Sequence, residues 1–294
     1  DEQKPNGGSE DIYPLKPEKS LPVNSLNFCK FGSVCGVGER EEILVAIPSV
    51  TESSAIDIWN LSNQRLITSS IGLDQKRERG YCMALKFFRN LNSQDSLSTN
   101  YLILAAYENG SVVLWSVKIG KNDSPLGDDE EIVITNQLWS RKEHIESALG
   151  LDVSVDKKFA ISTAGDNKIV KYIFDDENYR AEPLIKSTTI KHSGIADVKI
   201  RSDGKIFATA GWDTKIRIFS SNSLKPLAIL SYHRESVYAL AFSKVFEQED
   251  EISKSKSKDK EADDGTVQEQ LQQFTNHCLI GGGKDHRISL WEIY

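Results

Sequence analysis

The stretch ATAGWDTKIRIF, Ala208 to Phe219, decides the fold of this chain. It reads as an apolar strand, a turn at Trp212 and Asp213, and a second strand that ends in an aromatic residue. The same pattern occurs in five segments, whose terminal aromatic residues are Trp59, Trp115, Tyr172, Phe219 and Trp291. Self-similarity of this kind predicts a repeat architecture.

Each repeated unit contains a further strand upstream, and the first four units contain another one downstream. One lies upstream of the hairpin, in VNSLNF, CMALKF, ALGLDV, IADVKI and VYALAF, and another follows the aromatic residue in QRLITSS, NQLWS, EPLIKS and KPLAIL. His144, His192 and His233 each precede a unit, and the last two are 41 residues apart, close to the WD40 period of about 40 to 45 residues. Four short strands with this period predict an all-β WD40 β-propeller with about five blades in this sequence.

The spacing also predicts where the blades and connecting segments lie. Residues 1–22 contain four prolines and two adjacent glycines, which predicts a flexible linker. Residues 246–276 form an acidic, low-complexity insertion within the last blade, with a short helix expected near 267–274. Residues 121–131 form a smaller acidic loop. The five blades are expected at about 23–70, 81–140, 144–190, 192–231 and 233–294.

The last unit ends three residues after Trp291, at Tyr294, and therefore lacks a fourth strand. Propellers protect their sheet edges by closing the ring. We expect an N-terminal strand that is absent from this sequence to complete the last blade, because the chain starts at Asp1 and its one methionine is Met83. A closed five-bladed ring built only from these residues would contradict this expectation.

Polar residues recur at equivalent positions and predict a buried hydrogen-bonded chain within each blade. Such a chain links a histidine before the first strand, a serine or threonine on the second, an aspartate in the turn and the terminal aromatic residue. The expected members are His144, Ser162 and Asp166 in unit three, His192, Thr209 and Asp213 in unit four, and His233, Asp285 and Trp291 in unit five. Gly281 occupies the serine position in unit five, Asn109 replaces the turn aspartate in unit two, and no histidine opens units one and two.

Histidine, serine and aspartate also form hydrolase triads, but their repetition favours a structural role, because one active site needs one constellation. We therefore expect no catalytic residue; a propeller hydrolase would need a unique polar cluster. Residues 281–283, GGG, are not followed by the lysine and helix of a phosphate-binding loop. The four cysteines form no CxxC pair, so we expect neither a metal nor a cofactor.

The formal net charge of −7 and the pI of about 5.4 argue against a large nucleic-acid surface. Two interpretations remain for the basic run SKSKSKDK: an import or nucleic-acid patch, or a solvated loop open to phosphorylation. The apolar runs are much shorter than the roughly 20 residues of a membrane helix. Scattered cysteines indicate a reducing compartment, and we expect the nucleus and cytoplasm.

The residues just before each turn are expected on the propeller face that carries the loops preceding the first strands. This predicts protein contacts by Trp212, Lys284, Glu108 and Gly165. Exposed tryptophan is enriched in binding hot spots. The alternative is that Trp212 packs against its own hairpin.

Several motifs resemble one subfamily of WD40 proteins. They are AAYENGSVVLWSV (105–117), ATAGWDTKIRIF (208–219), KPLAILSYH (225–233) and GGGKDHRISLWEIY (281–294). The chain is similar, over about 23–294 without the insertion, to the subfamily of ASTRA-associated protein 1 and guanine nucleotide-binding protein β-subunit-like protein 1. It departs from the general WD40 pattern because no Trp-Asp pair ends the third strand of a unit.

The resemblance implies a seven-bladed propeller, with about two blades upstream of Asp1. It also implies a non-enzymatic scaffold subunit of an ASTRA or TTT assembly, which supports maturation and stability of phosphatidylinositol-3-kinase-related kinases and chromatin-linked functions. The implied partners are Tel2-, Tti1- and Tti2-type proteins, a Tra1-type kinase-related protein and RuvB-like ATPases. The alternatives are a generic WD40 adaptor or a G-protein β-like subunit, whose usual N-terminal heptad helix is not seen in residues 1–22.

Overall fold

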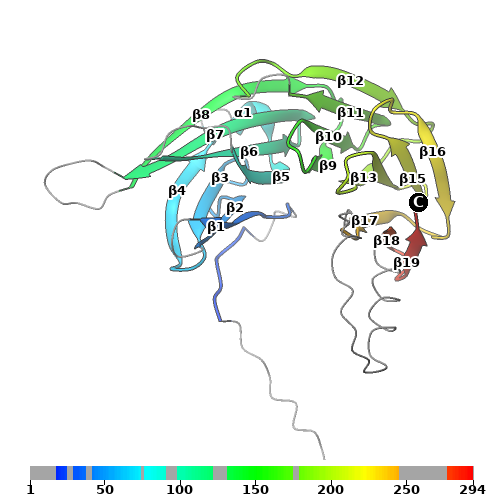
Figure 1. Cartoon of the computed structure of the whole chain (residues 1–294), viewed down its shortest axis with the longest axis horizontal. Helices are drawn as coiled ribbons and strands as arrows, with labels where there is room; N and C mark the ends of the chain where they lie inside the picture. The colour runs from blue at the N-terminus through cyan, green and yellow to red at the C-terminus, as the bar shows by residue number, and fades with distance from the viewer. Residues whose placement is uncertain are drawn as a thin grey trace, which may run out of the picture.

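In the part of the chain that the structure describes, nineteen strands form five antiparallel sheets arranged in an arc, and one short helix, α1 (Lys76–Arg79), precedes the second sheet (Figure 1). The computed structural model describes residues 18–24, 29–37, 42–73, 76–90, 98–121, 131–174, 179–244 and 277–293. These stacked sheets confirm the predicted all-β propeller fold. Most of the expected linker, residues 122–130 of the expected loop, and the insertion with its predicted short helix lie outside the described residues.

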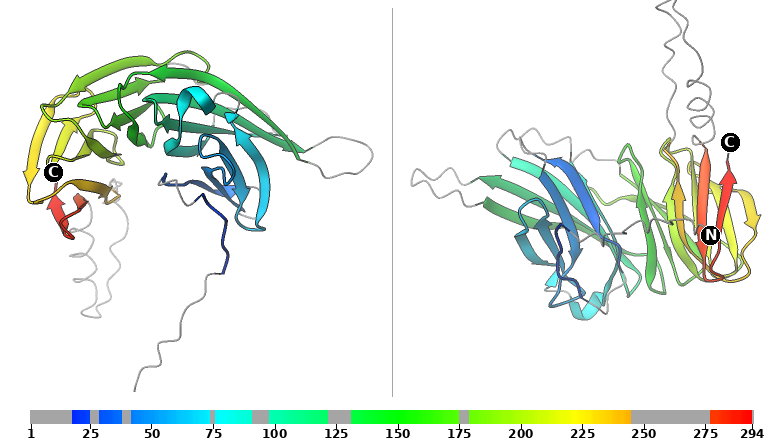
Figure 2. Two further views of the ribbon diagram at one scale, coloured as in Figure 1. Left: turned by 180° about the vertical axis from the view of Figure 1, so that it is seen from behind. Right: turned by 90° about the horizontal axis from the view of Figure 1, so that it is seen from below.

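The five sheets, here called blades 1 to 5, contain strands that follow one another from the inside of the arc outward (Figures 1 and 2). The innermost strands are β1 (Gly32–Val37), β5 (Cys82–Arg89), β9 (Ala148–Val153), β13 (Ile195–Ile200) and β17 (Val237–Phe242). The second strands are β2 (Glu42–Pro48), β6 (Ser98–Tyr107), β10 (Phe159–Ala164), β14 (Ile206–Gly211) and β18 (Cys278–Gly283). The third strands are β3 (Ile56–Asn60), β7 (Ser111–Lys121), β11 (Lys168–Ile173), β15 (Lys215–Ser220) and β19 (Ile288–Glu292). The outer strands are β4 (Arg65–Ile71), β8 (Glu131–Lys142), β12 (Leu184–Thr189) and β16 (Pro226–Ser231).

The hydrophobic core consists of four layers, each between two consecutive blades. The terminal aromatic residues of blades 2 to 5 lie in these layers and pack toward the preceding blade; they are Trp115, Tyr172, Phe219 and Trp291. Between blades 3 and 4, the Phe207 and Phe219 rings stack with centroids 5.1 Å apart. The aromatic endings recur because each one fills an interface between sheets.

Blade 5 has three described strands and an uncovered apolar face. Tyr238, Ile280, Ile288 and Leu290 are 48%, 42%, 76% and 68% exposed. In the other layers such side chains are covered by a neighbouring sheet, so this face is where a further sheet would pack. Within the described part of the chain the arc is not a closed ring (Figure 1). The seven-blade count and the completing strand stay predictions.

Carboxylates on the innermost strands tie consecutive blades together. Asp152 on β9 accepts the N–H of Ile200 on β13 at 2.8 Å. Asp197 on β13 accepts the N–H of Leu240 on β17 at 3.1 Å. Both carboxylates are buried, and Lys86 pairs with Asp152 at 2.6 Å. These bonds satisfy backbone donors at sheet edges that would otherwise be left without a partner.

The tie through Asp197 is testable with Asp197→Asn. The carboxylate accepts the N–H groups of Val198 and Leu240 through different oxygens, whereas an amide offers one oxygen and turns an NH₂ toward the second donor. We expect urea unfolding to show a loss of about 1–3 kcal/mol.

The matched control is Lys199→Met, which removes a partly exposed ion-pair partner of the same carboxylate. It should cost less than about 1 kcal/mol. Equal losses in the two variants would mean that the backbone tie contributes nothing of its own.

Candidate protein-contact face

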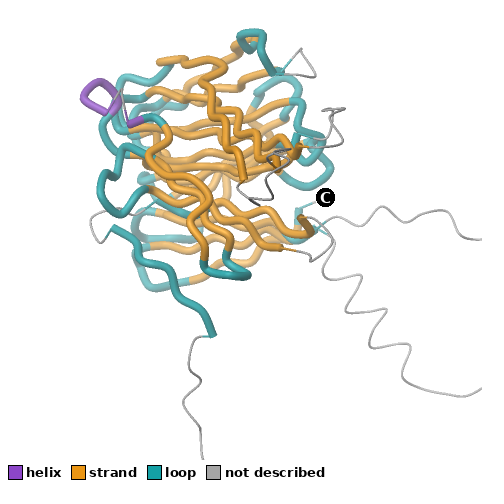
Figure 3. The backbone as a smooth tube through the Cα atoms, turned by 90° about the vertical axis from the view of Figure 1, so that its left-hand side faces the viewer, coloured by secondary structure: helices purple, strands orange, loops and turns teal. Residues whose placement is uncertain are grey.

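The four residues predicted as contacts share one backbone hydrogen bond. Each donates its N–H to a carbonyl in the loop that precedes the innermost strand of its own blade. The bonds run from Glu108 to Tyr81 (2.9 Å), Gly165 to Ser147 (3.0 Å), Trp212 to Gly194 (2.8 Å) and Lys284 to Ser236 (2.8 Å). The turns of four consecutive blades therefore lie along one rim of the arc, seen from the side in Figure 3. We call this rim the turn face and include the exposed residues Tyr81, Ile145, Glu146, Arg234 and Arg287 of the same loops and turns.

Trp212 is partly packed and partly exposed. Its indole covers Gly194, whose φ of +91° favours glycine, and its Cη2 would lie 3.8 Å from a Cβ at Gly165. The ring thus rests on the loop of its own blade and reaches toward blade 3, yet Trp212 remains 43% exposed. The ring therefore packs on the loop before β13, not on its own β14–β15 hairpin, and a contact role for Trp212 stays a prediction.

Charge and apolar surface are unevenly distributed over the turn face. Exposed Glu108 and Glu146 belong to blades 2 and 3, whereas Arg234, Lys284 and Arg287 belong to blade 5. Ile145, on blade 3, is 85% exposed. Glu235, beside Arg234, is also exposed. Exposed apolar side chains among charged ones are typical of a surface that recognises another protein.

In blade 3 the predicted polar residues form one buried chain. His144 Nδ1 lies 3.1 Å from Asp166 Oδ1, and its Nε2 lies 2.8 Å from Ser162 Oγ. Ser162 Oγ lies 3.1 Å from the Tyr172 hydroxyl. Burial lowers the pKa of His144 below its ordinary value, although the Asp166 carboxylate opposes this effect. The chain connects the turn to both central strands and holds this part of the turn face in place.

In blade 5 the chain contains a serine that the sequence interpretation missed. His233 bonds to Asp285 at 3.0 Å and to Ser289 Oγ at 2.9 Å, and Trp291 Nε1 donates to the same hydroxyl at 2.9 Å. Ser289 lies opposite Gly281 in the β18–β19 ladder. The hydroxyl therefore comes from the third strand instead of the second. A serine two residues before the terminal aromatic residue is the sequence feature that could have predicted it.

The chain predicted for blade 4 is wrong. His192 is exposed, and no hydrogen bond within the described residues joins it to Asp213 or Thr209. Asp213 instead accepts two bonds from Arg217, at 2.9 and 2.5 Å, and Arg217 lies opposite Thr209 in the ladder. Burial alone would raise the pKa of Asp213, but the bonds and charge of Arg217 lower it. The planar guanidinium occupies both carboxylate oxygens.

Blade 2 has no histidine, and Arg79 of α1 occupies the corresponding place. Its guanidinium carbon lies 5.5 Å from the Tyr107 ring centroid and 5.1 Å from that of Trp115. Arg79 Nη2 also donates to Gln137 on β8, and the Arg79 carbonyl accepts the Asn109 N–H. This buried cation holds the turn by contacts with aromatic rings. The sequence interpretation considered only histidine and so missed an arginine three residues before β5.

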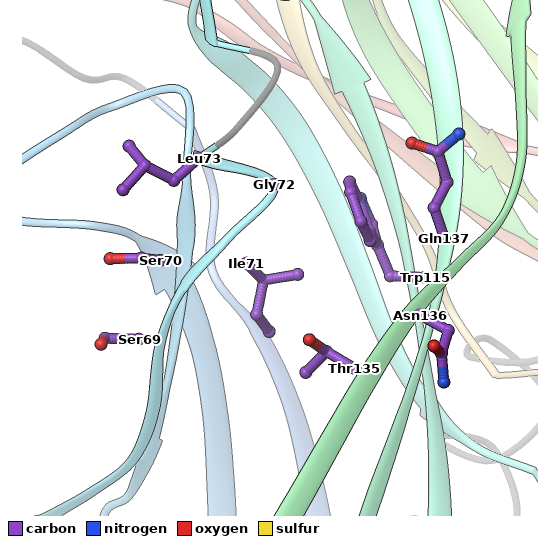
Figure 4. Close-up of a pocket in the computed structure, with 9 residues that line it drawn as sticks. All are labelled: Ser69, Ser70, Ile71, Gly72, Leu73, Trp115, Thr135, Asn136 and Gln137. Atoms are coloured by element: carbon purple, nitrogen blue, oxygen red, sulfur yellow. The ribbon is translucent and has the colours of Figure 1, made fainter.

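A groove of about 590 Å³ lies between the outer strands of blades 1 and 2 (Figure 4). Ile71 and Trp115 provide apolar surface, and hydroxyl and amide side chains of β4 and β8 provide the polar surface. Gly72 keeps the groove open, because a Cβ there would lie 2.9 Å from Trp115 Cζ2. The registers of β4 and β8 shift beside the groove, and such bulges often adjoin binding sites.

Neither a metal-binding cluster nor a membrane-spanning helix is found in the part of the chain that the structure describes. It contains no group of three or more His, Cys, Asp or Glu side chains arranged to hold a metal ion. No helix there is long and apolar enough to cross a membrane.

Ser289→Ala tests the chain in blade 5. The change removes the hydroxyl shared by His233 and Trp291, so two buried ring nitrogens lose a partner. We expect the free energy of unfolding to fall by about 1–3 kcal/mol in urea titrations. Ser223→Ala, at an exposed position, is the control and should change it by less than about 0.5 kcal/mol. Similar losses in both variants would contradict the role of Ser289.

The lowered pKa of His144 predicts a pH dependence of stability. Because the folded state disfavours the protonated ring, the stabilisation is complete above about pH 6.5 and is lost as the pH falls toward the lower folded-state pKa. The gap in melting temperature between the wild type and His144→Gln should therefore narrow between about pH 7.5 and about pH 5.5. His192→Gln, at an exposed position, should leave the melting temperature unchanged at both pH values. A constant or widening gap for His144→Gln would refute this assignment.

Known proteins resemble this chain over nearly its whole sequence, which spans about 70% of the length of these relatives. Residues 185–220 match the family described as WD domain, G-beta repeat. The chain is 32% identical over 320 residues to ASTRA-associated protein 1 of Penicillium rubens, covering 94% of this chain and 71% of the relative. It is 32% identical to ASTRA-associated protein 1 of Aspergillus flavus (94% and 70% covered) and 29% identical to guanine nucleotide-binding protein subunit beta-like protein 1 of Mus musculus (94% and 67% covered). The resemblance indicated by the sequence motifs is thereby confirmed, and the chain belongs to the ASTRA-associated protein 1 family of WD40-repeat proteins.

Proposed function

We propose that this chain is a non-enzymatic scaffold subunit that binds partner proteins through its turn face. The observation that carries the proposal is the exposure of Ile145 and Trp212, which lie among charged residues on adjacent blades whose turns are held by equivalent backbone bonds. Rigid scaffolds that present such side chains on loops are suited to protein recognition. The buried histidine, serine and aspartate residues hold the turns, which supports a structural role for them.

The family supports a more specific proposal. We assign the chain to an ASTRA- or TTT-type assembly, because the relatives are named ASTRA-associated protein 1. In this assembly its partners would be Tel2-, Tti1- and Tti2-type proteins, a Tra1-type kinase-related protein and RuvB-like ATPases. The scaffold would support the maturation and stability of phosphatidylinositol-3-kinase-related kinases and chromatin-linked functions, in the nucleus and cytoplasm.

The name of the mouse relative favours a second candidate, a G-protein β-like signalling subunit. The two functions differ in their partners: a β-like subunit would bind a γ-type chain through an N-terminal heptad helix. Residues 18–24, the described part of the N-terminal region before residue 29, form no helix. Affinity purification of the full-length protein distinguishes the two candidates by what it recovers.

Ile145→Glu tests the turn face directly. The side chain is 85% exposed, so the new charge should leave the melting temperature unchanged. We expect recovery of Tti-type and RuvB-like proteins with the tagged protein to fall by roughly tenfold, the effect of losing one hot-spot contact. Quantitative mass spectrometry of the purified complexes measures the recovery of these partner proteins.

Val155→Glu is the matched control, because Val155 is 63% exposed on the same blade but follows β9 at its opposite end. It should retain the partners. Trp212→Ala should also reduce recovery, with some loss of melting temperature because its ring covers Gly194. Equal recovery with Ile145→Glu and wild type would contradict the turn-face proposal, and recovery of a γ-type chain would favour the second candidate.

A further inference from the structure

Two of the four cysteines lie side by side where blade 1 meets blade 2. The Sγ atoms of Cys29 and Cys82 are 4.0 Å apart, and both residues carry thiols. The other two cysteines lie elsewhere: Cys35 is exposed on β1, and Cys278 begins β18 in blade 5. We propose that Cys29 and Cys82 form an oxidisable dithiol, a modification site at which a peroxide converts the two thiols into one disulfide.

The backbone around the pair is placed for such a bond. Strand β1 packs closely against β5, because a Cβ at Gly32 would lie 2.8 Å from the backbone nitrogen of Phe87. A disulfide requires an S–S distance of about 2.05 Å, so the sulfurs must approach by about 2 Å. Cys29 lies outside any strand, and Cys82 stands at a register shift in β5, so small side-chain and backbone adjustments suffice.

Each cysteine has a neighbouring contact that joins its segment to another part of the fold. Lys30 Nζ pairs with Asp197 of blade 4 at 3.1 Å. The backbone N–H of Cys82 donates to the Ser53 carbonyl of blade 1 at 2.9 Å. The thiols are therefore held near each other by contacts on both sides and not only by their own approach.

The difference in exposure sets the order of the chemistry. Cys29 is half-buried and Cys82 is fully buried, so a peroxide reaches Cys29 first. Its sulfur is oxidised to a sulfenic acid as the O–O bond breaks, and one water forms. The Cys82 sulfur, on losing its proton, then attacks the Cys29 sulfur; the S–S bond forms, the S–O bond breaks and a second water leaves. Two thiols and one peroxide thus give one disulfide and two waters.

The second step should accelerate with increasing pH. The hydrogen bond with Cys29, together with burial, raises the pKa of the Cys82 thiol well above its ordinary value. The thiolate is the attacking species, and its fraction increases with pH.

The disulfide would join two residues separated by 53 positions and fasten blade 1 to blade 2 next to the turn face. Tyr81, which precedes Cys82, is 45% exposed and bonds to Glu108 through both its N–H and its carbonyl. Oxidation would therefore restrain the end of the turn face formed by these two residues. The modification itself does not depend on the identity of the partner proteins.

Peptide mapping of the purified, reduced protein after treatment with hydrogen peroxide tests the proposal. Remaining thiols are blocked, and the protein is digested with trypsin without reduction. We expect residues 20–30 (SLPVNSLNFCK) linked to residues 80–86 (GYCMALK), with a mass lower by two hydrogen atoms than the two peptides combined. This species should exceed any linked pair that contains Cys35 or Cys278 by about tenfold.

Two single variants make the result decisive. The Cys35→Ser variant changes an exposed cysteine of β1 and should still form the linked peptide. The Cys29→Ser variant should not form it. Circular dichroism establishes that both variants are folded before oxidation. Wild-type protein with a native spectrum that yields only oxidised Cys29, or a Cys35-containing link, overturns the proposal.

Discussion

The blades of this protein carry apolar side chains on both faces, and a sheet of this kind is stable only when a neighbour covers each face. A single four-stranded sheet cannot bury both faces alone. Blades 2 to 4 therefore each pack between two neighbours, and the core forms as a series of layers instead of one central cluster. The recurring aromatic residue fills the layer toward the preceding blade. The exposed apolar face of blade 5 follows from the same requirement.

Within this stack, different polar groups hold the turn between the second and third strands of each of blades 2 to 5. Blades 3 and 5 use a histidine, a serine hydroxyl and an aspartate, although the serine comes from different strands. In blade 4 the guanidinium of Arg217 pairs with the carboxylate of Asp213. In blade 2 the guanidinium of Arg79 contacts two aromatic rings. In blades 3, 4 and 5 hydrogen bonds connect the turn to the strands, and in blade 2 the Arg79 guanidinium does so by contact with two aromatic rings. The turns of blades 2 to 5 are therefore all held in place even though the residues differ.

Because the recurring residues are buried and hold the turns, the exposed side chains are left to differ from blade to blade. This is why the proposed scaffold function rests on Ile145, Trp212 and the charged residues around them. The same junctions bring together other distant residues. The Cys29–Cys82 pair and the groove beside Trp115 both lie where blades 1 and 2 meet.

The sequence by itself determined the propeller fold, its family and the turn positions, because strand alternation, turn residues and the repeat period are local signals. The tertiary structure alone decided which side chains meet. Ser289 replaces the hydroxyl missing at Gly281 through cross-strand register, and Arg217 displaces His192 because it lies opposite Thr209. Arg79 reaches Trp115, and Cys29 reaches Cys82, only after two sheets have packed together. Partners chosen by register and by packing between blades cannot be read from spacing along the chain, since the contact is set by three-dimensional geometry.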